Sequence, residues 1–132
     1  MFDVLDISAS ALQAQRARMD AIAQNIANMN STRDAAGRVA PYRRRFAVFM
    51  AGRRENPALP GVRVQIKEDA SVREAYEPFH PDADSRGIVR YPNIDLAIEY
   101  VNALEASRAY EASVTAMEVT KAMINASLRL LA

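Results

Sequence analysis

The stretch that decides the fold is 93–132, which reads NIDLAIEYVNALEASRAYEASVTAMEVTKAMINASLRLLA. Steps of three and four residues along it trace a stripe that is mostly apolar or small, and no Gly or Pro interrupts it. The stripe consists of Leu96, Tyr100, Ala103, Ser107, Tyr110, Val114, Met117, Lys121, Ile124, Leu128 and Leu131. This period predicts a helix that buries one side along another helix. At 1.5 Å per residue the helix would be about 55 Å long, which exceeds the diameter of a small domain, about 30 Å.

A second stripe of the same period runs through residues 3–30. Its members are Leu5, Ser8, Leu12, Gln15, Met19, Ile22, Ile26 and Met29. Many alanines between them raise the helix propensity and leave smooth surfaces for close approach. The small polar residues of 28–32, NMNST, compete for backbone hydrogen bonds and predict that this helix ends there.

The middle of the chain, 33–92, has a different character, because all six prolines and all four glycines fall in it. The segment 62–67, VRVQIK, alternates apolar and polar residues strictly, which is the clearest strand signal in the chain. Segments 42–49 and 88–90 are also predicted to be strands. They form a small β-rich insert that is too small to be very stable alone.

These patterns together predict a mainly α fold. The two terminal helices pair as an antiparallel, coiled-coil-like hairpin, and the β-rich insert lies between them. Residues 1–32 and 93–132 form one terminal-helix assembly domain, and 33–92 form the insert. Such a pair leaves much apolar surface in water, so we expect it to be marginal alone and stable when further subunits cover it. The residues alone therefore indicate an interaction protein that assembles through its terminal helices.

The expected assembly interface takes most of its residues from the two stripes and adds Asn28, Leu104 and Arg108. Its residues are Leu5, Leu12, Gln15, Met19, Ile22, Ile26, Asn28, Tyr100, Leu104, Arg108, Tyr110, Val114, Met117, Lys121, Ile124 and Leu128. Lys121 is the exception on an apolar stripe. Two alternatives fit it: its ammonium reaches the edge of the seam, or it pairs with an acid of a neighbouring subunit and fixes the register.

Composition excludes several classes of protein. The chain has 132 residues, a net charge of +1 and no cysteine, so a disulfide framework, a thiolate metal site and a cysteine nucleophile are excluded. Nothing approaches a run of about 18 apolar residues, so no membrane span is expected. The first residues, MFDVLD, contain acids and no long apolar run, and we expect no cleaved secretory signal.

A basic segment offers an alternative function. Residues 33–54 contain seven arginines against a single aspartate, a local net charge of +6, with aromatic residues interleaved. A small nucleic-acid-binding protein with a coiled-coil arm would show such a patch. Because the whole chain is nearly neutral, a contact to acidic neighbours or a solvated strand face explains it better, and no nucleic-acid partner is expected.

Two other patterns are weak. The segment 82–87, DADSRG, is similar to a calcium loop, but Arg86 stands where an oxygen ligand is needed and Asn93 where a bidentate Glu is needed. A turn rich in Asx hydrogen bonds is the alternative. His80 is the single histidine, and nothing in the sequence brings it to Ser71 or Ser85, so we expect no enzyme, metal or cofactor.

Three blocks of the sequence resemble the bacterial flagellar rod and hook protein family. They are ALQAQRARMDAIAQNIANMNST at 11–32, YEP, HPDAD and GIVRYPN between 76 and 93, and EASRAYEA with KAM between 105 and 123. The middle block is similar to the proximal rod members in particular. Their joint occurrence, in this order and spacing, is specific and covers nearly the whole chain.

The resemblance implies a structural subunit of the proximal rod, the drive shaft of the flagellar basal body, which assembles into a helical tube and transmits torque. It also implies export by the flagellum's own secretion apparatus, without a cleaved signal, into the periplasmic part of the basal body. The implied partners are other copies, the other proximal and distal rod proteins, and the rod–membrane-ring junction protein. No catalytic activity is implied.

Overall fold

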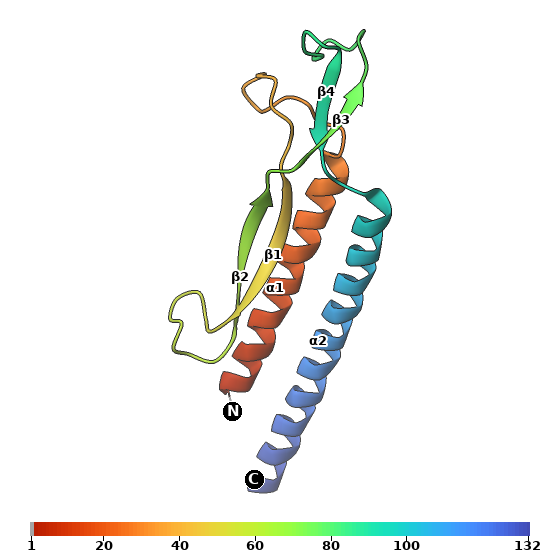
Figure 1. The fold of residues 1–132 in the computed structure, drawn as a ribbon. Coiled ribbons are helices and arrows are strands. Elements are labelled where there is room, and N and C mark those ends of the chain that lie inside the picture. The colour runs from red at the N-terminus through yellow and green to blue at the C-terminus, as the bar shows by residue number, and fades with distance from the viewer. Residues whose placement is uncertain (1) are drawn as a thin grey trace.

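The computed structural model describes residues 2–132. Its elements are α1 (Phe2–Ala27), β1 (Arg44–Ala51), β2 (Val62–Asp69), β3 (Val72–Tyr76), β4 (Ile88–Pro92) and α2 (Leu96–Leu131). Figure 1 shows an elongated molecule in which α1 and α2 lie side by side and run in opposite directions. The two chain ends therefore lie toward the same end of the molecule, where α2 extends beyond α1.

Local hydrogen bonds accompany the end of α1 and the start of α2. After Ala27 the side chain of Asn28 donates to the carbonyl of Gln24, and the amide of Ser31 donates to the carbonyl of Asn28. The predicted end of the first helix at 28–32 is confirmed to within a few residues. α2 starts after Asp95, whose carboxylate accepts from the amides of Ala97 and Ile98 and caps the helix.

The insert contains two separate two-stranded sheets. β1 pairs antiparallel with β2 from Arg44 opposite Asp69 to Ala51 opposite Val62. The five-residue strands β3 and β4 pair in the same sense. The strands predicted at 42–49, 62–67 and 88–90 are present with shifted bounds, whereas β3 was not predicted. Its sequence, VREAY, is short and has two charges, so it carries little strand signal.

The two hairpins lie in different places. The β1–β2 hairpin runs along α1, and the β3–β4 hairpin stands beyond the other end of the helix pair (Figure 1). The helices have 26 and 36 residues and the strands 8, 8, 5 and 5, so less than half of the chain is helical. The prediction of a mainly α fold is therefore only partly right: two long terminal helices enclose a small antiparallel β insert.

The core is thin and spread along the molecule. Its buried apolar residues are Ala14, Ala21, Ile22, Val89, Tyr91, Ile94 and Ala106, and Asn25 and Glu99 are buried with them. Because the core is thin, many large apolar side chains remain at the surface.

The loop between β1 and β2 is attached to the start of α1. Arg53 places Nη1 3.2 Å from Oδ2 of Asp6, and its Nε donates to the carbonyl of Pro60 at 3.0 Å. The amide of Val62 donates to Oγ of Ser10 at 3.0 Å. These contacts hold the tip of the β1–β2 hairpin against the first three turns of α1, a placement that the sequence alone did not indicate.

Candidate assembly interface

The sequence-predicted interface residues fall into three groups by exposure. Ile22 is buried in the core of the single chain. Half-buried are Leu5, Leu12, Gln15, Met19, Ile26, Asn28, Tyr110, Val114, Met117 and Ile124. Exposed are Tyr100, Leu104, Arg108, Lys121 and Leu128. Gln15 is notable because its Oε1 is buried and has no hydrogen-bond donor within residues 2–132.

The face that the first turns of α2 bury against α1 is rotated from the expected stripe. The buried residues of α2 are Glu99 and Ala106, which are not members of the stripe. The stripe member Ser107 still contacts the other stripe, with its Oγ 3.9 Å from Met19 Sδ. Tyr100, one residue after Glu99, is exposed. Hydrophobicity alone selects Tyr100 for the seam, whereas the structure buries an acid that has a partner and an alanine that allows close approach.

A cluster of polar groups joins the last turn of α1, the start of β1 and the first turn of α2. Asn25 donates to the carbonyl of Arg45 at 2.7 Å and to Oε2 of Glu99 at 3.3 Å. Its Oδ1 accepts from the amide of Arg45 at 2.8 Å and from the hydroxyl of Tyr42 at 3.4 Å. Arg44 Nε donates to Oε1 of Glu99 at 2.6 Å. Burial in this cluster raises the pKa of the Tyr42 hydroxyl.

The side of α2 opposite its buried residues carries a further stripe, the outer stripe, which was not predicted from the sequence. Its members are Ala97, Val101, Leu104, Arg108, Ala112, Thr115, Val119, Ala122, Ala126 and Leu130, all exposed. They alternate in steps of three and four residues over the whole helix, and Arg108 is the single charge among them. The same periodicity analysis, applied a second time to α2, would have found this stripe.

The last turns of α2 extend beyond the N-terminal end of α1, and this part of α2 is called the overhang. The contact between Met19 and Ser107 sets a register in which the start of α1 faces about residue 124 of α2. Beyond that point α2 continues to Leu131, and Leu130 and Leu131 are 87% and 81% exposed. Figure 1 shows this blue end of α2 extending past the N-terminal end of α1.

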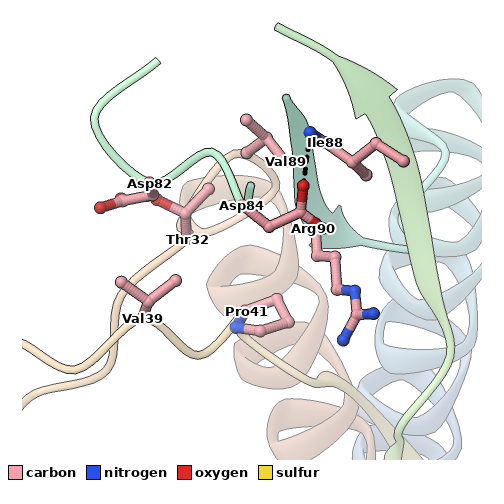
Figure 2. Close-up of a pocket in the computed structure, with 8 residues that line it drawn as sticks. All are labelled: Thr32, Val39, Pro41, Asp82, Asp84, Ile88, Val89 and Arg90. Carbon is pink, nitrogen blue, oxygen red and sulfur yellow. Dashed lines mark hydrogen bonds between the residues drawn. The ribbon is translucent and has the colours of Figure 1, made fainter. Parts of the chain in front are cut away.

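A cavity of about 240 Å³ lies between the loop after α1 and the β3–β4 hairpin (Figure 2). It is lined by Thr32, Val39, Pro41, Asp82, Asp84, Ile88, Val89 and Arg90. Asp82 accepts from Thr32 Oγ1 at 2.6 Å and from Arg33 Nε at 2.8 Å, and these bonds hold the pKa of its carboxyl below the usual range. The cavity acids thus bind donors of the chain itself.

The loop around the cavity resolves two sequence hypotheses. Asp84 Oδ1 accepts from the amides of Arg86 and Ile88, which confirms the Asx-type turn. The amide of Ile88 lowers the pKa of Asp84. His80 Nδ1 accepts from the amide of Asp82, and the imidazole lies edge-on against Tyr91. Within residues 2–132 no group of three or more His, Asp or Glu side chains could hold a metal ion.

The arginines of the basic segment are largely paired within the chain. Ion pairs join Arg33 to Asp82, Arg38 to Asp34, Arg44 to Glu99, Arg45 to Glu68, and Arg53 to Asp3 and Asp6. Five of the seven arginines thus have an acidic partner in the described chain. This pairing removes much of the local charge that a nucleic-acid surface requires.

The tip of the β3–β4 hairpin carries exposed aromatic side chains. Phe79 is 99% exposed and Tyr76 is 74% exposed. Inside the same hairpin the hydroxyl of Tyr91 donates to Glu77 Oε2 at 2.9 Å, which raises the pKa of Tyr91. The inner face of the hairpin is therefore satisfied within the chain, and its tip is apolar and solvent-facing.

Two protein families match the two ends of the chain. Residues 5–33 match the family described as flagella basal body rod protein, and residues 85–130 match the C-terminal family of the flagellar basal body rod FlgEFG proteins. The first match covers most of α1, and the second covers β4 and nearly all of α2. Both families consist of flagellar basal-body rod proteins, a class of structural subunits.

Individual relatives show to which family of rod proteins the chain belongs. The chain is 36% identical to the flagellar basal-body rod protein FlgC of Bacillus subtilis (strain 168), with 98% of this chain and 97% of the relative covered. It is 39% identical to that of Yersinia enterocolitica with the same coverage, and 41% identical to that of Aquifex aeolicus (strain VF5), with 92% and 90% covered. The chain belongs to the FlgC family of flagellar basal-body rod proteins.

Family membership confirms the resemblance found in the sequence. The chain is a structural subunit of the flagellar rod and not an enzyme. Neither α1 nor α2 contains an 18-residue segment that is apolar enough to cross a membrane. The exposed surfaces of the two helices are therefore the features that need a functional explanation.

Proposed function

We propose that the chain builds the proximal rod by burying the exposed surfaces of α1 and α2 against neighbouring subunits. In this proposal residues 1–32 and 93–132 act as one assembly unit, and 33–92 form an insert that docks on it. In this proposal the two helices form an antiparallel, coiled-coil-like pair. The support is that they run in opposite directions and carry apolar residues in steps of three and four.

The observation that carries the proposal is the unpartnered surface of α2. The overhang beyond about residue 124 exposes three leucines, Leu128, Leu130 and Leu131. Large apolar side chains that gather at a protein surface mark a site that a partner covers. The outer stripe continues this exposed surface along the full length of α2. Neighbouring subunits can therefore contact α2 both at the overhang and along the outer stripe.

The interface residues expected from the sequence have different roles in this proposal, according to their exposure. Leu104, Arg108 and Leu128 are exposed and belong to the outer stripe or the overhang, so they are assigned to contacts between subunits. Tyr110, Val114 and similar half-buried residues serve the contact within the chain and expose a margin to a neighbour. Ile22 is assigned to the core of the single chain because it is buried there.

The assembly would have the mechanical properties of a shaft. Contacts between different surfaces of neighbouring copies do not close, and they generate a helical array. Close-packed side chains deform little and transmit strain, which a torque-bearing tube needs. The proposed neighbours are other copies, other proximal and distal rod proteins, and the rod–membrane-ring junction protein. The proposed place is the periplasmic part of the basal body, reached through the flagellar export apparatus.

The experiment places a charge on the unpartnered surface. Leu104→Asp and Leu130→Asp alter exposed residues of α2. The free variant chains should therefore keep the circular dichroism spectrum of the unsubstituted chain, the parent. Ala116→Asp, exposed but off the outer stripe, is the matched control. Ile22→Asp would not serve, since it places a charge in the core of the single chain.

The expected result is loss of motility and of assembled rods in cells that carry Leu104→Asp or Leu130→Asp, while Ala116→Asp supports both. Rods are measured by electron microscopy of isolated basal bodies. Normal rods and motility in a strain carrying both Leu104→Asp and Leu130→Asp would refute the proposed interface.

A further inference from the structure

On the α2 side, the contact between α1 and α2 is smooth, so apolar packing alone specifies its register weakly. Within the described residues of α2, only Glu99 and Ala106 are buried. An alanine presents no large side chain that would block a slide along the partner helix. α2 is also ten residues longer than α1, with 36 residues against 26, so α1 has room to sit in more than one position.

The polar contacts across this seam differ in strength. Arg18 Nη2 lies 3.5 Å from Glu105 Oε2, but the Glu105 side chain is mostly exposed, and such surface pairs contribute little. Glu99 and Asn25 are both 0% exposed. A slide of seven residues would place Ala106 opposite Asn25 and separate the Glu99 carboxylate from both of its donors.

Asn25 is chemically saturated in the observed register. A carboxamide offers two N–H donors and two acceptor lone pairs. Both donors are used, toward the Arg45 carbonyl and Glu99, and the oxygen accepts from the Arg45 amide and Tyr42. Asn25 thus binds the edge of β1 as a neighbouring strand would, and any slide of α1 along α2 breaks at least one of these bonds.

We propose that Asn25, Glu99 and Arg44 form a register lock, which selects one alignment of α1 and α2 among several that apolar packing would allow. The lock also links that alignment to the β1–β2 hairpin, since Arg44 lies on β1. By fixing the register it fixes how many residues of α2 overhang α1. The lock concerns the fold of the single chain, so it can hold or fail independently of the proposed rod interface.

The physical basis is the difference between stability and specificity. The cost of removing charges from water cancels much of the attraction in a buried ion pair, so an apolar replacement is often neutral or stabilising. A buried polar residue at a helix seam can nevertheless fix the register, because other alignments leave it unpaired. The lock therefore predicts that an apolar replacement preserves folding and loses the unique alignment.

The experiment uses paired cysteines, which have no background because the chain contains no cysteine. Met19→Cys with Ser107→Cys reports the observed register, and Met19→Cys with Val114→Cys reports a slide of seven residues, about 10 Å along the helix. Each pair is bridged with a short bismaleimide in the full-length chain. The pairs are tested in the parent and in the Asn25→Leu, Arg44→Leu, Glu99→Leu triple variant.

In the parent, cross-linking at 19 and 107 should dominate, and failure of this pair would overturn the proposal. The triple variant should keep its helical circular dichroism while cross-linking at 19 and 114 rises at least about fivefold. Exclusive cross-linking at 19 and 107 in a folded triple variant would also overturn it.

If the triple variant does not fold, Glu99→Gln is the variant that tests the register lock. It keeps the shape of the side chain and removes the charge that Arg44 binds. The proposal predicts the same direction of change, a rise of cross-linking at 19 and 114 above the parent level. An unchanged ratio of the two products in a folded Glu99→Gln chain would refute the lock.

Discussion

Arg44 Nε lies 2.6 Å from Oε1 of Glu99, although the two residues are separated by 55 positions in the chain. The Glu99 side chain is 1% exposed and that of Arg44 is 24% exposed, so the carboxylate depends on protein donors. The ion pair joins the first residue of β1 to the first turn of α2. It is thus the point where the insert and the helix pair become one unit.

Removal of Arg44 alone should destabilise the chain. Arg44→Ala leaves a buried carboxylate without its cation, and loss of one partner of a buried pair costs about 3 kcal/mol. Urea unfolding followed by circular dichroism measures the change. Arg43→Ala removes the exposed arginine next to it and should change the free energy of unfolding by less than about 0.5 kcal/mol. Equal effects of the two substitutions would contradict this role of the pair.

The ion pair of Arg33 and Asp82 should make stability depend on pH in the acid range. Hydrogen bonds from Arg33 and Thr32 hold the pKa of Asp82 below the value of a free aspartate. A group whose pKa is lowered on folding stabilises the chain above its unfolded pKa, near 4, and loses this effect as the pH falls through the folded pKa. The melting temperature of Arg33→Ala should thus lie below that of the parent at about pH 7, and the two should converge by about pH 2.

Arg43→Ala controls for the change in net charge, since it removes the same charge from an exposed site. Its melting temperature should differ little from that of the parent across the same range. A difference between Arg33→Ala and the parent that widens as the pH falls would have the wrong sign for this linkage.

A comparison of two glycine positions distinguishes backbone strain from steric overlap. Gly52 and Gly37 have φ values of 102° and 78°, where residues other than glycine are strained. A Cβ at Gly52 would overlap with the Pro57 carbonyl oxygen, whereas one at Gly37 would meet open space. Gly52→Ala should therefore lower the free energy of unfolding by at least about 1 kcal/mol more than Gly37→Ala. A urea titration of both variants tests this order.

The helices were predictable because each has a long signal of one period. Ala27 ends α1 where the small polar segment begins, and Asp95 caps α2, so even the ends were encoded locally. β3 was not predictable, because its five residues include Arg73 and Glu74 and its pairing with β4 comes from the fold. The second sheet was missed for the same reason, because it consists of β3 and β4 alone.

The site was harder to predict than the fold. Hydrophobic periodicity selected Tyr100 for the helix seam, but the structure buries Glu99, whose partner Arg44 is far away in the sequence. No pattern in one helix reveals such a partner. Conversely, the outer stripe through Val101 and Leu104 has a clear period and was missed because one stripe already explained the helix.

If neighbouring subunits cover the α2 overhang in the assembled rod, Leu130 must be protected there. Maleimide labelling of a single Leu130→Cys measures this protection directly, in the free chain and in purified basal bodies, with acid-dissociated basal bodies as the control. We expect fast labelling in the free chain, at least about 100-fold slower labelling in intact basal bodies and full recovery after dissociation. Equal labelling rates in the free chain and in intact basal bodies would contradict it.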